Sequence, residues 1–209
     1  MSDITRRDAL KAFAVVSVAN LLDVGTPQLE RTLHAVESLE QGQAYTPKFF
    51  NRHEWPTVRL LADYVIPRDV RSGSATDAMA PEFMDFLLAD KDATESSKIS
   101  MRGGLAWLDN ESRSRFSQTF VNASDAQRRQ ILDDVAWPKR ARPEMSHGVA
   151  FFTRFRDLTA SGFFSTAMGW RDVQYIGNVF NPNWNGCPPA ALDKLGVSYD
   201  LMSSRTSSK

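Results

Sequence analysis

The residues best suited to bind a metal are three histidines, His34, His53 and His147, and a single cysteine, Cys187. The histidines are far apart in the sequence, and none has a second ligand three or four positions away, as in the HExxH motif. One cysteine cannot supply an internal disulfide, a CxxCH haem attachment, a four-cysteine iron–sulfur site or a cysteine-rich zinc site. We therefore expect no metal centre or covalent haem in this chain, so any redox cofactor must belong to a partner.

Four aspartates in and around one loop could supply a pair of carboxylates for general acid–base catalysis. They are Asp63, Asp69, Asp77 and Asp85. The ordinary role of such carboxylates is to cap helices and carry surface charge, which is the interpretation we favour. The chain also lacks the GxSxG and GxxxxGK(S/T) motifs, and Gly103-Gly104 does not have the spacing of a dinucleotide-binding fingerprint. The sequence thus argues against a self-contained enzyme.

Residues 158–178, LTASGFFSTAMGWRDVQYIGN, combine three glycines with aromatic and hydrogen-bonding side chains. We expect a helix that ends here, with breaks at Gly162 and Gly169. Glycine is used where the backbone takes a positive φ or comes close to another group, and aromatic residues with a polar group favour interfaces. We therefore predict a surface that docks a partner. Its residues, with one tryptophan from the following loop, are Gly162, Phe163, Phe164, Gly169, Asp172, Tyr175, Gly177, Asn178 and Trp184.

Asp172 and Tyr175 are three positions apart, so a single helical turn would place both on one side, where they could contact a partner. In the alternative, Asp172 caps the turn and Tyr175 packs over the glycines. We favour the partner contact slightly, because a protein core does not need so many glycines.

The start of the chain has the pattern of an export signal. Arg6 and Arg7 are followed by Leu10, Lys11 and an uncharged apolar stretch at residues 12–22. A basic region before a short apolar run is typical of such signals, and paired arginines indicate the twin-arginine route, which carries folded proteins. The alternative is an amphipathic first helix that begins at the arginines. No AxA cleavage site follows, so the signal is compatible with remaining uncleaved, and the apolar run is too short to span a bilayer.

The composition indicates a globular protein without net charge. Hydrophobic residues make up 42% of the chain, and Lys+Arg and Asp+Glu each total 25. A neutral chain has no general attraction for nucleic acid or for an anionic membrane. We expect no nucleic-acid partner, and membrane association only through a complex or through an uncleaved signal.

Apolar residues recur at helical spacing along most of the chain, and no stretch alternates with a period of two over the length of a strand. We therefore predict an all-α fold, a single irregular bundle of about seven short helices with a C-terminal loop region rich in glycine and aromatic residues. Separate helices are expected over 99–108 and 112–120. The predicted organisation is an export signal at 1–22, a polar helical arm or linker at 23–48, a helical domain at 49–200 and a disordered tail at 201–209.

Two local signals predict helix starts. Asn51 with Glu54 has the form of a helix cap, and Ser124 with Gln127 has the form of a capping box.

Residues 159–178 resemble the gluconate 2-dehydrogenase subunit 3 family. The pattern of that family runs T-x-x-G-(F/Y)-(F/Y), then G-x-x-D-(L/V)-x-Y, then G-N. Its positions in this chain are Thr159, Gly162, Phe163, Phe164, Gly169, Asp172, Val173, Tyr175, Gly177 and Asn178. The likeness extends to WPTVRLLADYVIPRD at 55–69 and PEFMDFLL at 81–88 and covers most of 49–199. The twin-arginine start is also similar to that of the family.

The resemblance implies a non-catalytic subunit that holds no cofactor itself. The usual partner in this family is a large FAD-bearing sugar or polyol dehydrogenase of the glucose–methanol–choline type, which lacks an export signal of its own. The pair is expected to reach the periplasm folded, on the signal of the small subunit. Some members add a cytochrome c subunit, whose haem c passes electrons to the respiratory chain. The resemblance does not specify the substrate.

Two hypotheses of other classes stay open at this point. One is a stand-alone periplasmic carbohydrate-binding module, with Trp184 and Tyr175 as stacking platforms. The other is an independent enzyme that uses a carboxylate or histidine near the loop at 68–78.

Overall fold

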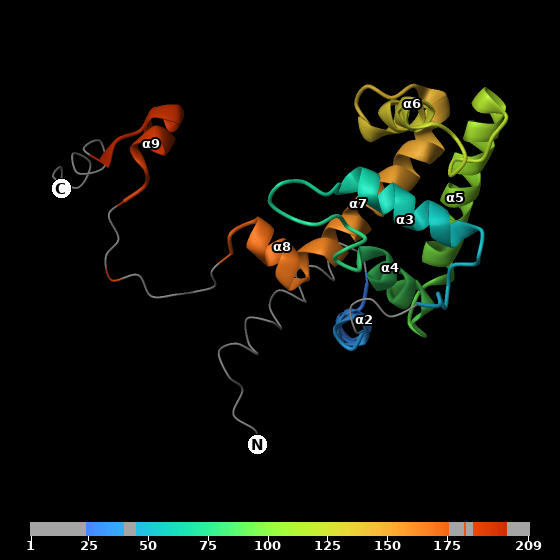
Figure 1. The fold of residues 1–209 in the computed structure, drawn as a ribbon, viewed down its shortest axis with the longest axis horizontal. Coiled ribbons are helices and arrows are strands. Elements are labelled where there is room, and N and C mark those ends of the chain that lie inside the picture. The colour runs from blue at the N-terminus through green and yellow to red at the C-terminus, as the bar shows by residue number, and fades with distance from the viewer. Residues whose placement is uncertain (1–23, 40–44, 176–181, 183–185, 200–209) are drawn as a thin grey trace, which may run out of the picture. The chain divides into compact units, whose positions relative to one another are not determined.

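The structure, a computed structural model, describes residues 24–39, 45–175, 182 and 186–199. Within these residues every regular element is a helix, which confirms the predicted all-α class (Figure 1). The chain divides into two units, residues 1–175 and residues 176–209. The described helices of the first unit are α2 (Thr26–Glu37), α3 (Glu54–Val65), α4 (Ala80–Ala89), α5 (Glu95–Phe116), α6 (Asp125–Ala136), the 3-10 helix η1 (Pro143–Met145), α7 (Ser146–Phe164) and α8 (Ala167–Asp172).

Helix α7 is the centre of the first unit, because it contacts α3, α4, α5, α6 and α8 (Figure 1). Its buried side chains include Phe151, Phe155 and Leu158, which recur every three or four residues and so share one face. At 19 residues α7 is not a short helix, and α5 is longer still at 22 residues. The prediction of a bundle built from short helices is therefore wrong for these two central elements.

Helix α5 is continuous where we predicted two helices. The stretch contains Gly103-Gly104 and Asp109, which lower helix propensity. Tertiary contacts offset that loss, because Gly104 lies against the Phe151 ring and Asp109 accepts the backbone N–H of Phe120 at 3.0 Å. The helix ends only at Ser117, whose φ of 58° is left-handed.

The two predicted caps are present. Ser124 and Gln127 form a reciprocal capping box at the start of α6. Before α3, the backbone N–H of Glu54 donates to Asn51 Oδ1, and the N–H of Asn51 donates to Glu54 Oε2, both at 2.9 Å.

We predicted a polar helical arm or linker at residues 23–48, and the helix α2 that forms there packs on α4. Leu29 is fully buried, and Gln28 Nε2 donates to the carbonyl of Leu87 at 2.9 Å. At the surface, the Arg31 guanidinium donates two hydrogen bonds to Asp90. A narrow apolar stripe on a polar helix is thus enough to attach α2 to the first unit.

The described part of the second unit contains α9 (Pro189–Leu195), which ends at Gly196 with a φ of 63°. Nearby, the backbone N–H of Cys187 donates to the hydroxyl of Tyr199 at 2.6 Å. Much of the predicted C-terminal loop region lies outside the described residues.

Candidate partner-binding surface

Helix α8 folds back directly on the end of α7, and two residues of its first turn explain why. The Thr166 hydroxyl accepts the N–H of Gly169 at 3.2 Å and donates to the carbonyl of Phe163 at 2.7 Å, so it caps α8 and ties it to α7. A Cβ on Gly169 would lie 2.4 Å from that same carbonyl oxygen. Only glycine allows this approach of the two backbones.

The C-terminal end of α8 is closed by a Schellman motif. The N–H of Tyr175 donates to the carbonyl of Trp170 at 2.9 Å, and the N–H of Gln174 donates to that of Arg171 at 3.1 Å. Gln174 has the left-handed φ of 55° that this motif requires. The rings of Trp170 and Tyr175 meet edge to face with centroids 6.1 Å apart, which supplies the apolar contact usual in the motif.

The loop between α3 and α4 holds α8 from the other side. Arg71 donates to the backbone carbonyl of Asp172, and its guanidinium lies 3.2 Å from the Asp172 carboxylate. The backbone N–H groups of Ser72 and Arg71 bond Asp69, which keeps the pKa of that carboxyl below its usual value and shapes the turn that presents Arg71. The loop and α8 therefore form one surface.

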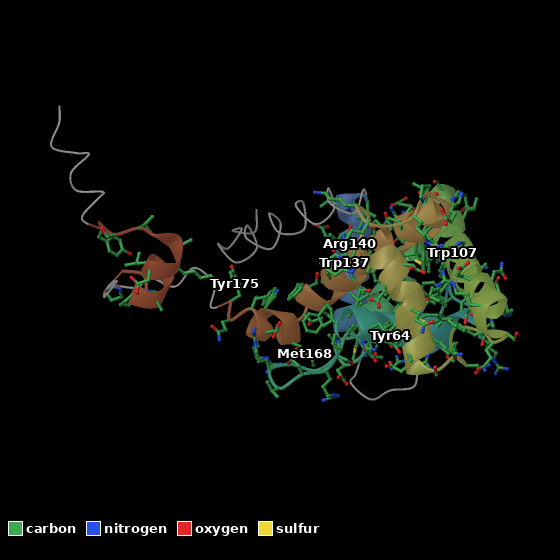
Figure 2. The ribbon with its side chains drawn as sticks, turned by 90° about the horizontal axis from the view of Figure 1, so that it is seen from above. Tyr64, Trp107, Trp137, Arg140, Met168 and Tyr175 are labelled. Carbon is green, nitrogen blue, oxygen red and sulfur yellow. The ribbon has the colours of Figure 1, made fainter. Side chains whose placement is uncertain are left out.

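Large apolar side chains are exposed on this surface, which we call the α8 surface. Its members are Val70, Phe164, Trp170, Val173 and Tyr175, each at least 41% exposed. Figure 2 shows Met168 and Tyr175 at the α8 end of the first unit, with Trp107 at the other end. Of these five, Trp170 and Tyr175 are in ring contact. Exposed apolar groups of this kind are typical of a protein-binding site.

The structure corrects several of the predicted interface residues. Gly162 does not break α7. It lies inside the helix, where a Cβ would be 3.1 Å from the Cα of Ala80. Phe163 is fully buried, so its ring is part of the core and offers no surface to a partner. Likewise Gly169 lies within α8 and serves packing.

Phe164, Asp172 and Tyr175 do come together around α8, although not as predicted. Tyr175 follows the end of the helix and does not share a helical turn with Asp172. Asp172 forms an ion pair with Arg71, which joins α8 to the α3–α4 loop. The remaining predicted positions lie outside the described residues: Gly177, Asn178 and Trp184 of the interface, and Arg6, Arg7, Leu10 and Lys11 of the export signal.

Sequence reasoning missed Val70, Trp170, Val173 and Arg71 as parts of this surface. Val173 stood in the family pattern, yet its exposure was not foreseen. Arg71 and Asp172 are 101 positions apart, so no local pattern could have paired them.

The four aspartates considered for catalysis all accept hydrogen bonds that shape the chain around them. Asp63 accepts from Thr76, Asp69 from Arg71 and Ser72, and Asp77 from Ser74 and Arg68. Asp85 is fully buried and accepts from the backbone N–H groups of residues 48–50 and from the Tyr45 hydroxyl. Each carboxylate thus has a structural task.

Two further findings concern cofactors and membranes. In the described ranges, no three His, Cys, Asp or Glu side chains lie close enough together to hold a metal ion. None of the helices described is both long and apolar enough to cross a membrane.

The chain matches the family model described as Gluconate 2-dehydrogenase subunit 3 over residues 52–182. The match covers more than half of the chain and includes the whole α8 surface. The chain belongs to the gluconate 2-dehydrogenase subunit 3 family. Membership implies a subunit of a multi-subunit dehydrogenase complex. No curated protein and no solved structure matches the chain.

Proposed function

We propose that this chain is the accessory subunit of a flavin-dependent sugar or polyol dehydrogenase, and that it binds, stabilises and exports the large catalytic subunit. The observation that carries the proposal is the α8 surface. Five large apolar side chains on α8 and the segments beside it are exposed, and all five lie inside the region that matches the family.

The contacts beneath the α8 surface suit a role in binding. In the chain by itself, α8 is already fixed by three features: the Schellman motif, the Thr166 cap and the Arg71–Asp172 pair. Ordering side chains at an interface costs affinity, so a surface that is already ordered binds more tightly. Aromatic anchors such as Trp170 and Tyr175 commonly dominate the binding energy of an interface. A permanent complex of this kind buries on the order of 2,000 Å² or more.

In this proposal the redox chemistry takes place in the partner. FAD is bound by the large subunit, and haem c by a cytochrome c subunit where one is present. The chain itself provides the binding surface, stabilises the large subunit and carries the export signal. Arg6 and Arg7 direct the folded pair through the twin-arginine route to the periplasm.

The test is purification of the chain, carrying an affinity tag at its C-terminus, from its native organism under mild conditions. We expect one large partner in equal amount, with the absorbance spectrum of a bound flavin. A panel of sugars and polyols, assayed with an artificial electron acceptor, then identifies the substrate. Recovery of the chain alone, without flavin, contradicts the proposal. Binding of a sugar by that isolated chain would instead favour a carbohydrate-binding module.

A further inference from the structure

A hollow of about 160 Å³ lies between the N-terminal end of α3 and one face of α5. Helix α5 contributes Arg102, Asp109 and Arg113, whose spacing of seven and then four residues places them on one side of the helix. The end of α3 contributes His53 and Glu54. The volume equals that of about five water molecules, which suits a small group.

One residue that lines the hollow is a buried aspartate, which accepts a hydrogen bond from a histidine. Asp109 is 5% exposed, and its Oδ1 accepts the backbone N–H of Phe120 at 3.0 Å. Its Oδ2 accepts from Nε2 of His53 at 2.7 Å. A carboxylate in this position fixes the orientation of the imidazole. Among the described residues nothing bonds Nδ1, the second ring nitrogen of His53.

Arg113 is the second group with unused hydrogen-bonding capacity. Its guanidinium lies 3.4 Å from both Asn110 Oδ1 and Asp109 Oδ2, longer than a normal N–H···O bond. The side chain is 47% exposed. A guanidinium has five N–H donors and matches the paired oxygens of carboxylate and phosphate groups.

The other charged groups around the hollow are already occupied. Arg102 donates to the Phe49 carbonyl at 2.7 Å and lies 4.6 Å from the centre of the Phe49 ring, so it adds positive charge from a fixed place. Glu54 accepts the Asn51 N–H in the cap of α3. The two acids, Asp109 and Glu54, are therefore bonded to internal donors, and the two arginines are among the residues that line the hollow.

We propose that this hollow binds a small oxyanion, a carboxylate or phosphate group, held by the Arg113 guanidinium beside His53. The N-terminal end of α3 adds a favourable dipole. The hollow is distinct from the α8 surface, because it lies at the start of α3, whereas the loop that reaches α8 follows the end of that helix (Figure 1). Twelve residues of helix separate the two by roughly 18 Å.

Nuclear magnetic resonance of the imidazole signals tests the proposal directly, because the sequence contains only three histidines. The full chain, purified with a tag free of histidine, is titrated at fixed pH and ionic strength with sodium phosphate, sodium acetate or sodium chloride. We expect a saturable shift of the His53 signals with phosphate or acetate and none with chloride. Whichever of the two binds more tightly identifies the ligand group. The exposed His34 and His147 serve as internal references.

The variant Arg113→Gln should weaken this binding about tenfold or more, which corresponds to the loss of a charged hydrogen bond. Arg129→Gln is the matched control, since Arg129 is an exposed arginine that pairs with Asp125 on α6. Amide spectra of both variants establish that the fold is intact. Equal shifts of all three histidines, no saturation, or unchanged binding by Arg113→Gln would each overturn the proposal. The same variant is also tested for copurification with the flavoprotein. If Arg113→Gln loses anion binding but still recovers the flavoprotein, the anion site and the docking surface act separately.

Discussion

Two neighbouring glycines in α5 have opposite surroundings. A Cβ on Gly104 would lie 1.9 Å from Cδ2 of Phe151, whose ring is buried against α5. A Cβ on Gly103 would meet no atom of the described residues within 4 Å. The contact between α5 and α7 therefore depends on Gly104, while Gly103 only lowers the helix propensity of α5.

The pair gives a prediction with its own control. We expect Gly104→Ala to lower the free energy of unfolding by about 1–3 kcal/mol or more, because the Phe151 ring must move in a packed core. Gly103→Ala should raise that free energy by about 0.5–1 kcal/mol, because alanine favours an exposed helix. Urea unfolding followed by circular dichroism measures both. A similar loss in the two variants would contradict the packing of α5 on α7.

Glu82 is a buried carboxyl group, and its oxygen Oε2 has no hydrogen-bond partner among the described residues. Burial raises the pKa of Glu82, and the bond from Arg59 to Oε1 at 2.9 Å only partly opposes this. As pH rises above about 4.3, the unfolded chain loses the Glu82 proton first, so this residue favours unfolding increasingly toward neutral pH.

We therefore expect the free energy of unfolding of the wild type to fall relative to that of Glu82→Gln as the pH rises from about 4 to about 7. Urea unfolding of both proteins across this range gives the difference at each pH. A difference that stays constant, or that shifts in favour of the wild type, would show that the carboxyl is well solvated or fully paired.

Among the helices, α8 is the one whose position we expect to depend on a single exposed side chain, Arg71. Its two contacts with Asp172 join the α3–α4 loop to the end of α8. Because Arg71 is mostly exposed, the pair adds little to global stability. Its effect should be local.

Arg71→Gln should therefore speed hydrogen exchange at the amides of Val173, Gln174 and Tyr175, while the global unfolding free energy changes by less than about 0.5 kcal/mol. Arg129→Gln, which breaks an exposed pair within α6, should leave those amides unchanged. Exchange measured by mass spectrometry reports both. Unaltered protection in Arg71→Gln would mean that α8 is held by the α7 contact alone.

The helices themselves could be predicted in part from the sequence. The caps at Asn51 and Ser124 are local, so the pattern of neighbouring residues was sufficient. The breaks at Gly162 and Gly169 were wrong because glycine serves two purposes, positive φ and close approach. Only the packing of α7 on α4, and of α8 on α7, shows that these two serve close approach.

The candidate site could be predicted only as a region. Phe164 and Tyr175 were chosen from their residue types, and both are exposed at α8. Phe163 has the same type and sits beside Phe164, yet the two rings point to different environments, one buried and one exposed. Which of the two faces solvent depends on how α8 covers the end of α7, and a sequence pattern does not contain that information.

At the scale of the whole molecule, the proposal joins two functions in one chain, binding and export. If Arg6 and Arg7 form a twin-arginine signal, the variant Arg6→Lys with Arg7→Lys should retain both this chain and its flavoprotein partner in the cytoplasm. Cell fractionation with a flavin-linked activity assay measures the distribution of each. The lysines keep the positive charge, so normal export of the double variant would contradict the signal.

A pair of variants tests whether the α8 surface binds the large subunit. Val173→Lys places a charge at an exposed apolar position of that surface, and Ile99→Lys places the same charge at an exposed apolar position of α5. The amount of flavoprotein that copurifies per mole of tagged chain is then measured for each. We predict a loss of about tenfold or more for Val173→Lys, as expected for an interface core, and wild-type recovery for Ile99→Lys. Equal recovery with the two variants would contradict the assignment of the α8 surface.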